Sequence, residues 1–164
     1  MNHVYFLAKK VEDDRNCYRA YDAVNLIGES HISLKSRLHP ISMETPQIRM
    51  DGLIDPDKTI FPGAENILYF SDGSDPARII YLGEHQHRIV WGRLNILVRY
   101  WHLRWKFFLD GKELASMVPV RGAEPVTAVT ESRWSPCLTM MSRADLPEPL
   151  AMIMLHFPLL QTAL

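Results

Sequence analysis

The sequence has few of the features of a secreted or membrane-spanning protein. It has two cysteines, Cys17 and Cys137, in 164 residues, and we expect both to be reduced thiols in a cytoplasmic protein. No basic segment precedes a long apolar stretch at the N-terminus, so no signal peptide is expected. No apolar run reaches the roughly 18 residues of a membrane-spanning helix, so no transmembrane span is expected.

Net charge and composition are ordinary. The 18 basic and 19 acidic residues leave a net charge of −1, which provides no overall attraction to nucleic acid or membrane, and a nucleic-acid partner is not expected. The apolar fraction of 47% and charged fraction of 23% are typical of globular proteins. A chain of this length suits one domain, so we expect residues 1–164 to form a single unit.

Motifs for catalysis and cofactor binding are missing as well. The sequence has no Gly-x-Ser-x-Gly elbow and no glycine-rich phosphate loop. Cys137 has no partner base nearby in sequence, and His156 lies in an apolar segment, where we expect a core histidine that donates to a carbonyl of the barrel. We therefore expect no catalytic residue and no cofactor, and the sequence favours a protein that is not an enzyme.

The most informative segment is the apolar C-terminus. Three of the last fifteen residues are polar, and they form no polar face. A helix that is apolar on all sides must be enclosed, and fifteen residues rise about 22 Å, less than the roughly 30 Å of a bilayer core. We expect a buried helix at about 146–162, capped by Asp145, with Pro147 or Pro149 in its first turn and an interruption at Pro158.

Strand patterns dominate the rest of the chain. Short apolar or alternating runs are separated by Pro, Gly, Asp and Asn. They predict strands at 4–8, 17–21, 26–34, 48–54, 66–71, 78–82, 88–91, 99–109, 112–118, 126–131 and 138–142, with loops at 35–47 and 55–65. We expect a mainly β fold, an antiparallel β-barrel that encloses the hydrophobic C-terminal helix. A two-sheet sandwich with the helix over one open end is the alternative.

The clearest strand pattern spans 99–109. Its odd positions are mostly apolar and its even positions mostly basic or polar, which is the two-residue period of a half-buried strand. The pair Asp110-Gly111 follows, and this pair is preferred in two-residue type I′ turns. The resulting hairpin predicts that Phe107 lies opposite Leu114.

Three segments are similar to a known group of β-barrels. They are residues 18–29, residues 104–112 and the terminal helix after residues 146–149, which read YRAYDAVNLIGE, RWKFFLDGK and LPEP. With these segments the chain resembles the tubby-like superfamily, which includes the LURP-one-related proteins and the phospholipid scramblases. The resemblance implies a strand-rich barrel around a hydrophobic C-terminal helix. No binding residue of the family matches a position here, so none is assigned.

His85 and His87 form a pattern that suits a metal site. Two histidines separated by one residue share a face of a strand, as a pair of ligands requires. Cupins carry such a pair with a carboxylate a few residues on, but residues 85–109 contain no Asp or Glu. We expect a polar hairpin tip and no metal. A small-molecule-binding or cupin-like metal enzyme that uses the barrel lumen remains the alternative, and a lumen filled by the helix would weaken it.

Charge is distributed unevenly along the chain. Residues 85–109 contain basic residues but no acidic ones, whereas residues 44–76 contain seven acidic and two basic residues. The two regions either pair with each other or leave a basic face that suits anionic lipid head groups or single-stranded nucleic acid. We place this candidate surface on the outward side of the central hairpin, opposite an apolar face with Trp101 and Phe107. Its residues are Arg88, Arg93, His102, Arg104 and Lys106.

These patterns predict a non-enzymatic binding module that holds an anionic lipid or a protein partner through the basic face. A partner-specific interaction protein that uses the loops at 35–47 and 55–65 is a further alternative.

Overall fold

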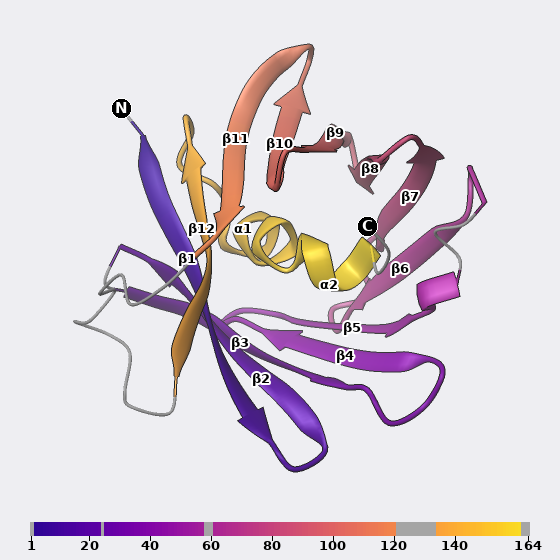
Figure 1. The fold of residues 1–164 in the computed structure, drawn as a ribbon, viewed down its shortest axis with the longest axis vertical. Helices are drawn as coiled ribbons and strands as arrows, with labels where there is room; N and C mark the ends of the chain where they lie inside the picture. The colour runs from indigo at the N-terminus through magenta and orange to yellow at the C-terminus, as the bar shows by residue number, and fades with distance from the viewer. Residues whose placement is uncertain (1, 24, 58–60, 121–133, 162–164) are drawn as a thin grey trace.

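The computed structural model of the chain describes residues 2–23, 25–57, 61–120 and 134–161. These residues form twelve antiparallel strands closed into a barrel, with two short helices inside it (Figure 1). The strands follow one another around the wall in chain order, and β1 closes the ring by pairing with both β2 and β12. The fold is the predicted barrel and not the sandwich.

The elements follow one another along the chain as twelve strands and then two helices. The strands are β1 His3–Glu12, β2 Arg15–Asp22, β3 Asn25–Ser33, β4 His39–Glu44, β5 Arg49–Ile54, β6 Glu65–Phe70, β7 Ala77–Gly83, β8 Gln86–Trp91, β9 Leu94–Trp101, β10 Arg104–Leu109, β11 Lys112–Pro119 and β12 Ser135–Ser142, and the helices are α1 Glu148–Leu155 and α2 Phe157–Gln161. The predicted loop at 35–47 was wrong, since it contains β4, with Pro40 as its second residue. The predicted strand at 126–131 lies outside the described residues.

The strand predicted at 99–109 is in fact two strands joined by a tight turn. His102 and Leu103 have φ values of 50° and 59°, and Trp101 pairs with Arg104 across them. In a two-residue hairpin the two flanking residues face the same side. Outward positions are therefore odd in β9 and even in β10. The prediction of a buried Trp101 was wrong for this reason.

The next hairpin confirms the predicted turn and corrects its register. Asp110 and Gly111 have φ values of 51° and 77°, as a type I′ turn requires. The pairing shifts by one residue between Phe107 and Phe108, so that Phe107 lies opposite Ala115 and not Leu114. A β-bulge of this kind inserts one unpaired residue into a strand.

The helices supply the centre of the core. Ile153, Leu155, Phe157 and Leu160 have no exposed surface. Helix α1 lies against β1, β3 and β12, and α2 lies against β7, so the helical segment crosses the lumen as Figure 1 shows. The apolar residues 150–155 of α1 are stable here because they are buried inside the wall.

The start of the helical segment and its interruption differ in detail from the prediction. Pro147 occupies the N-cap position without a side-chain hydrogen bond, and Pro149 lies in the first turn. Asp145 instead accepts a hydrogen bond from the Tyr5 hydroxyl at 3.3 Å. The break between α1 and α2 falls at His156, two residues before Pro158, whose missing N–H cannot continue the helical hydrogen bonding.

A buried polar contact fixes the helix to the wall. His156 Nδ1 lies 2.7 Å from the carbonyl oxygen of Met152, so Nδ1 donates and Nε2 accepts from the Ser30 hydroxyl at 2.6 Å. His156 is buried as predicted, but it donates within its own helix and not to a barrel carbonyl, and its contact with the barrel is the hydrogen bond that it accepts from Ser30. Farther along, Asn66 Nδ2 donates to the Leu160 carbonyl at 3.0 Å.

Gly28 in β3 lies where the wall and α1 pack tightly against each other. A Cβ at this position would lie 2.5 Å from the Glu44 carbonyl oxygen and 2.8 Å from the Met152 sulfur. We expect Gly28→Ala to lower the free energy of unfolding by roughly 2–3 kcal/mol, because backbone of β4 must move. Gly111→Ala is the control, since its Cβ would meet open space and only its positive φ costs free energy. Chemical denaturation of both variants tests this, and equal losses would contradict it.

Candidate anion-binding surface

The outer side of β8, β9 and β10 combines basic and apolar side chains. Strand pairing aligns Arg99 with Lys106, Leu97 with Phe108, and Trp101 with Arg104, and it places Arg88 beside Leu97. These seven outward residues are called the basic face below. They are Arg88, Leu97, Arg99, Trp101, Arg104, Lys106 and Phe108.

Two shallow grooves cross the basic face and share Arg99 and Phe108. One has a volume of about 430 Å³ and also contacts Arg88, Asn95, Leu97, Asp110 and Gly111. The other, of about 450 Å³, is lined by Trp101, His102, Arg104 and Lys106 together with the shared pair. The stems of long basic side chains cover apolar surface while their charged ends stay in water. The face therefore offers an apolar floor surrounded by positive charge.

Few negative charges compensate these cations. Arg99 and Lys106 lie directly opposite each other, an arrangement of like charges that is destabilising without an anion. Lys106 also lies 3.7 Å from Glu113. Arg88 and Arg104 donate to the neutral Asn95 and Ser116, at 3.0 and 3.3 Å.

The guanidinium of Arg99 lies over the Phe108 ring, with its central carbon 5.3 Å from the ring centroid. Among the described residues, the arginines of the basic face form no ion pair.

The predicted surface residues do not all come together. Arg88, Arg104 and Lys106 lie on the basic face, and His102 lies in the turn, with its ring 4.6 Å from that of Trp101. Arg93 precedes β9, and the length of that strand, about 26 Å, separates it from the Trp101 end. Arg99 was missed because the unrecognised turn reversed the inward and outward positions of β9. The positive φ of two non-glycine residues leaves little signal in the sequence.

The acidic segment at residues 44–76 does not neutralise the basic face. Two of its carboxylates pair with arginines on the same or the adjacent strand, Asp51 with Arg49 at 3.0 Å and Glu65 with Arg78 at 2.6 Å. Asp55 and Asp57 face Arg37, at 4.0 and 3.6 Å. Ion pairs between residues 44–76 and residues 85–109, which the sequence allowed, are thus not seen among the described residues.

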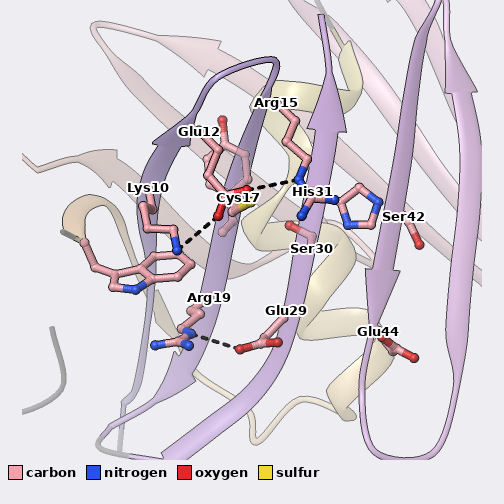
Figure 2. A pocket seen from close by; sticks show the side chains of 12 residues that line it. Lys10, Glu12, Arg15, Cys17, Arg19, Glu29, Ser30, His31, Ser42 and Glu44 are labelled. Atoms are coloured by element: carbon pink, nitrogen blue, oxygen red, sulfur yellow. Dashed lines mark hydrogen bonds and ion pairs between the residues drawn. The ribbon is translucent and has the colours of Figure 1, made fainter. Parts of the chain in front are cut away.

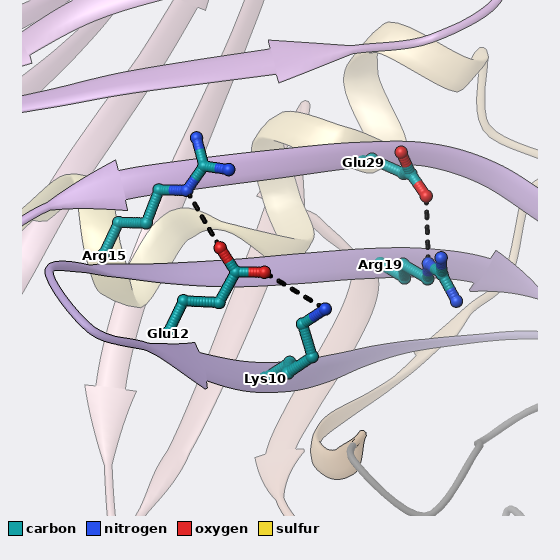
Figure 3. A network of polar contacts seen from close by, with 5 residues as sticks. All are labelled: Lys10, Glu12, Arg15, Arg19 and Glu29. Atoms are coloured by element: carbon teal, nitrogen blue, oxygen red, sulfur yellow. Dashed lines mark hydrogen bonds and ion pairs between the residues drawn. The ribbon is translucent and has the colours of Figure 1, made fainter.

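A pocket of about 230 Å³ over β1, β2 and β3 provides a contrast (Figure 2). The basic side chains Lys10, Arg15 and Arg19 of this pocket each have a carboxylate partner (Figure 3). Glu12 binds Lys10 at 3.1 Å and Arg15 at 3.2 Å, and Arg19 binds Glu29 at 2.9 Å. This pocket is therefore close to electrically balanced, unlike the basic face.

The two cysteines are poor nucleophiles. Burial and the neighbouring Glu12 carboxylate raise the pKa of the Cys17 thiol, which lines the pocket over β1–β3. Burial raises the pKa of Cys137 to about 12, and its Sγ donates to the Leu7 carbonyl at 3.3 Å. Thiolates are the reactive form, so neither environment activates its cysteine. The buried Ser30–His156 pair holds the helix, and the imidazole has no exposed surface.

The histidine pair considered as a metal site is split. His85 lies in the β7–β8 turn with a φ of 62°. His87 is buried on the inner side, with its ring centroid 5.1 Å from Tyr81 and 5.2 Å from Phe157. No group of three or more His, Cys, Asp or Glu side chains that could hold a metal ion is found within the described residues.

Comparisons of the chain with protein families, with curated proteins and with solved structures each find no match. Among the described helices, none has the length and apolar character required to cross a bilayer.

Proposed function

We propose that this chain is a non-enzymatic binding module, tubby-like in architecture, whose basic face holds an anionic lipid head group. The observation that supports it most is the set of four cations on three adjacent strands, of which only Lys106 has an ion pair, with Glu113 at 3.7 Å, among the described residues. Such a cluster, next to an exposed tryptophan, matches the chemistry of an anionic membrane surface. An acidic segment of a protein partner is the second candidate for the same face.

The proposal places the protein in the cytoplasm. Both cysteines are free, as is usual in a reducing compartment, and the cytoplasmic leaflet carries the anionic lipids that attract basic surfaces. The occupied lumen also supports binding at the outer wall over chemistry inside the barrel. A lumen-based enzyme would need room between the wall and helices, and residues 150–157 of these helices are already buried.

The test is co-sedimentation with vesicles of phosphatidylcholine containing 30% phosphatidylserine, at low salt. We expect wild type to bind and Arg104→Glu with Lys106→Glu to weaken binding at least ~30-fold, since each cation near an anionic surface contributes about 1 kcal/mol. Raising the salt concentration should weaken wild-type binding as well, because exposed charges are screened. Both side chains are exposed, so the fold should not change.

Arg93→Glu with Lys112→Glu is the matched control. It changes the charge by the same amount beyond the other end of β9 and β10, because Arg93 precedes β9 and Lys112 begins β11 after the turn that follows β10, and both residues are exposed. We expect this variant to retain most of the wild-type affinity. Wild type that ignores the vesicles, or two variants that bind equally well, would remove the lipid proposal.

A further inference from the structure

We propose that the β9–β10 hairpin tip inserts into the lipid bilayer, with Trp101 and Leu103 as apolar anchors below the anionic head groups that the basic face binds. This inference rests on the proposed function and specifies how the partner is engaged. In this arrangement a lipid surface, and not a soluble ligand, occupies the groove lined by Trp101, Arg104 and Lys106.

The tip exposes unusual side chains for its position. Trp101 is 71% exposed and Leu103 is 48% exposed, although an aromatic ring and a branched aliphatic chain gain most from leaving water. Leu103 also holds a φ of 59°, a conformation that glycine or asparagine adopts at lower free energy. The Asp110-Gly111 turn at the other end of β10 uses the favourable pair, and the Glu84-His85 turn, which also has positive φ values, carries polar side chains.

The spacing between the apolar tip and the cations fits a bilayer. Trp101 and Arg104 form one cross-strand pair, and Arg99 and Lys106 form a pair two residues farther from the tip. Two residues of strand span about 7 Å. The polar head-group layer is roughly 5–7 Å thick on each side of the hydrocarbon core. When Trp101 lies at the boundary of that core, Arg99 and Lys106 therefore lie at the level of the lipid phosphates.

Charge and shape together favour a membrane over an acidic protein segment. The exposed apolar side chains project from the end of a hairpin, and the cations lie behind them on the same face. Tryptophan is enriched at the boundary between head groups and acyl chains, and basic side chains there extend their charges toward the phosphates. An acidic peptide would satisfy the cations but would leave the protruding tip in water.

Trp101 itself provides the test, through quenching of tryptophan fluorescence by brominated phosphatidylcholine in vesicles with 30% phosphatidylserine. We expect strong quenching in wild type and a large reduction in Trp101→Phe, because Trp101 is 71% exposed at the tip, whereas Trp105, although next to the tip pair, faces the core. Trp91 stacks on Phe70, and Trp105 and Trp134 are buried. Trp101→Ser with Leu103→Ser should weaken vesicle binding at least tenfold. Tyr69→Ser is the control for loss of an exposed aromatic residue, since Tyr69 is 60% exposed on β6.

The outcomes separate this inference from the function on which it rests. Wild type that binds the vesicles without quenching, together with a Trp101→Ser, Leu103→Ser variant of unchanged affinity, overturns insertion and leaves the electrostatic function standing. Wild type that binds soluble polyglutamate but no vesicles overturns both in favour of an acidic protein partner. Unchanged melting temperatures of the variants exclude loss of fold as the cause.

Discussion

A chain that ends at Asp145 is expected to show no cooperative thermal unfolding and to be insoluble or molten. Removing the helical segment exposes the inner side of the whole wall. Burial of Ile153, Leu155, Phe157 and Leu160, which have no exposed surface, contributes about 1.5–3 kcal/mol each, so that the four together approach the ~5–15 kcal/mol that stabilises a typical domain. Calorimetry and near-ultraviolet circular dichroism would measure the loss of the transition and of fixed packing.

Single substitutions make the test quantitative. Leu155→Ala should lower the free energy of unfolding by roughly 2–5 kcal/mol. Leu34→Ala is the control, because Leu34 is 51% exposed on the outside, and it should change stability by less than about 0.5 kcal/mol. A truncated chain that melts sharply at the full-length temperature would show that the wall is stable without its helices.

The second large effect is expected on acidification. Burial lowers the pKa of His156 to about 4. Burial, with a smaller contribution from the charge of His85, lowers the pKa of His87 to about 4 as well. Both rings are neutral in the folded protein, whereas they take up protons near pH 6.5 when unfolded. Stability should therefore be full above pH 6.5 and should fall as the pH drops from 6.5 to 4, by about 3 kcal/mol for each histidine.

Chemical denaturation between pH 4 and 8 would measure this dependence. His87→Leu should flatten the curve, because it removes one titrating group and a ring nitrogen that has no hydrogen-bond partner within the described residues. Leu34→Ala is the control, since Leu34 is 51% exposed and has no titratable side chain, and it should leave the slope unchanged. A His87→Leu curve as steep as that of wild type would contradict the assignment.

The architecture was predictable because two strong signals agreed. The last fifteen residues are apolar on all sides, which requires an enclosure, and the preceding chain contains enough short strands to provide it. The closed barrel of Figure 1 satisfies both requirements. Residues 39–44 escaped prediction because Pro40 reads as a loop signal, although proline is tolerated near the start of a strand.

The candidate surface was only partly predictable, for a reason of backbone geometry. A strand pattern gives side-chain directions only while the strand continues, and one unrecognised turn inverts every position on one side of it. The turn at His102-Leu103 exposed Trp101 and Arg99, and it left Arg93 at the far end of the sheet. Register also depends on bulges such as the one opposite Phe107, which no local residue preference in the hairpin indicated.

The order of the elements along the chain also determines when the protein can fold. Helices α1 and α2 follow every strand of the wall, and β1 finds its second neighbour only in β12. During synthesis the wall strands therefore leave the ribosome before the residues that fill them, with β1 as an open sheet edge. Pairings of such long sequence separation form slowly and expose surfaces prone to aggregation. A nascent chain stalled before residue 146 should consequently be a good substrate for chaperones, however stable the finished barrel is.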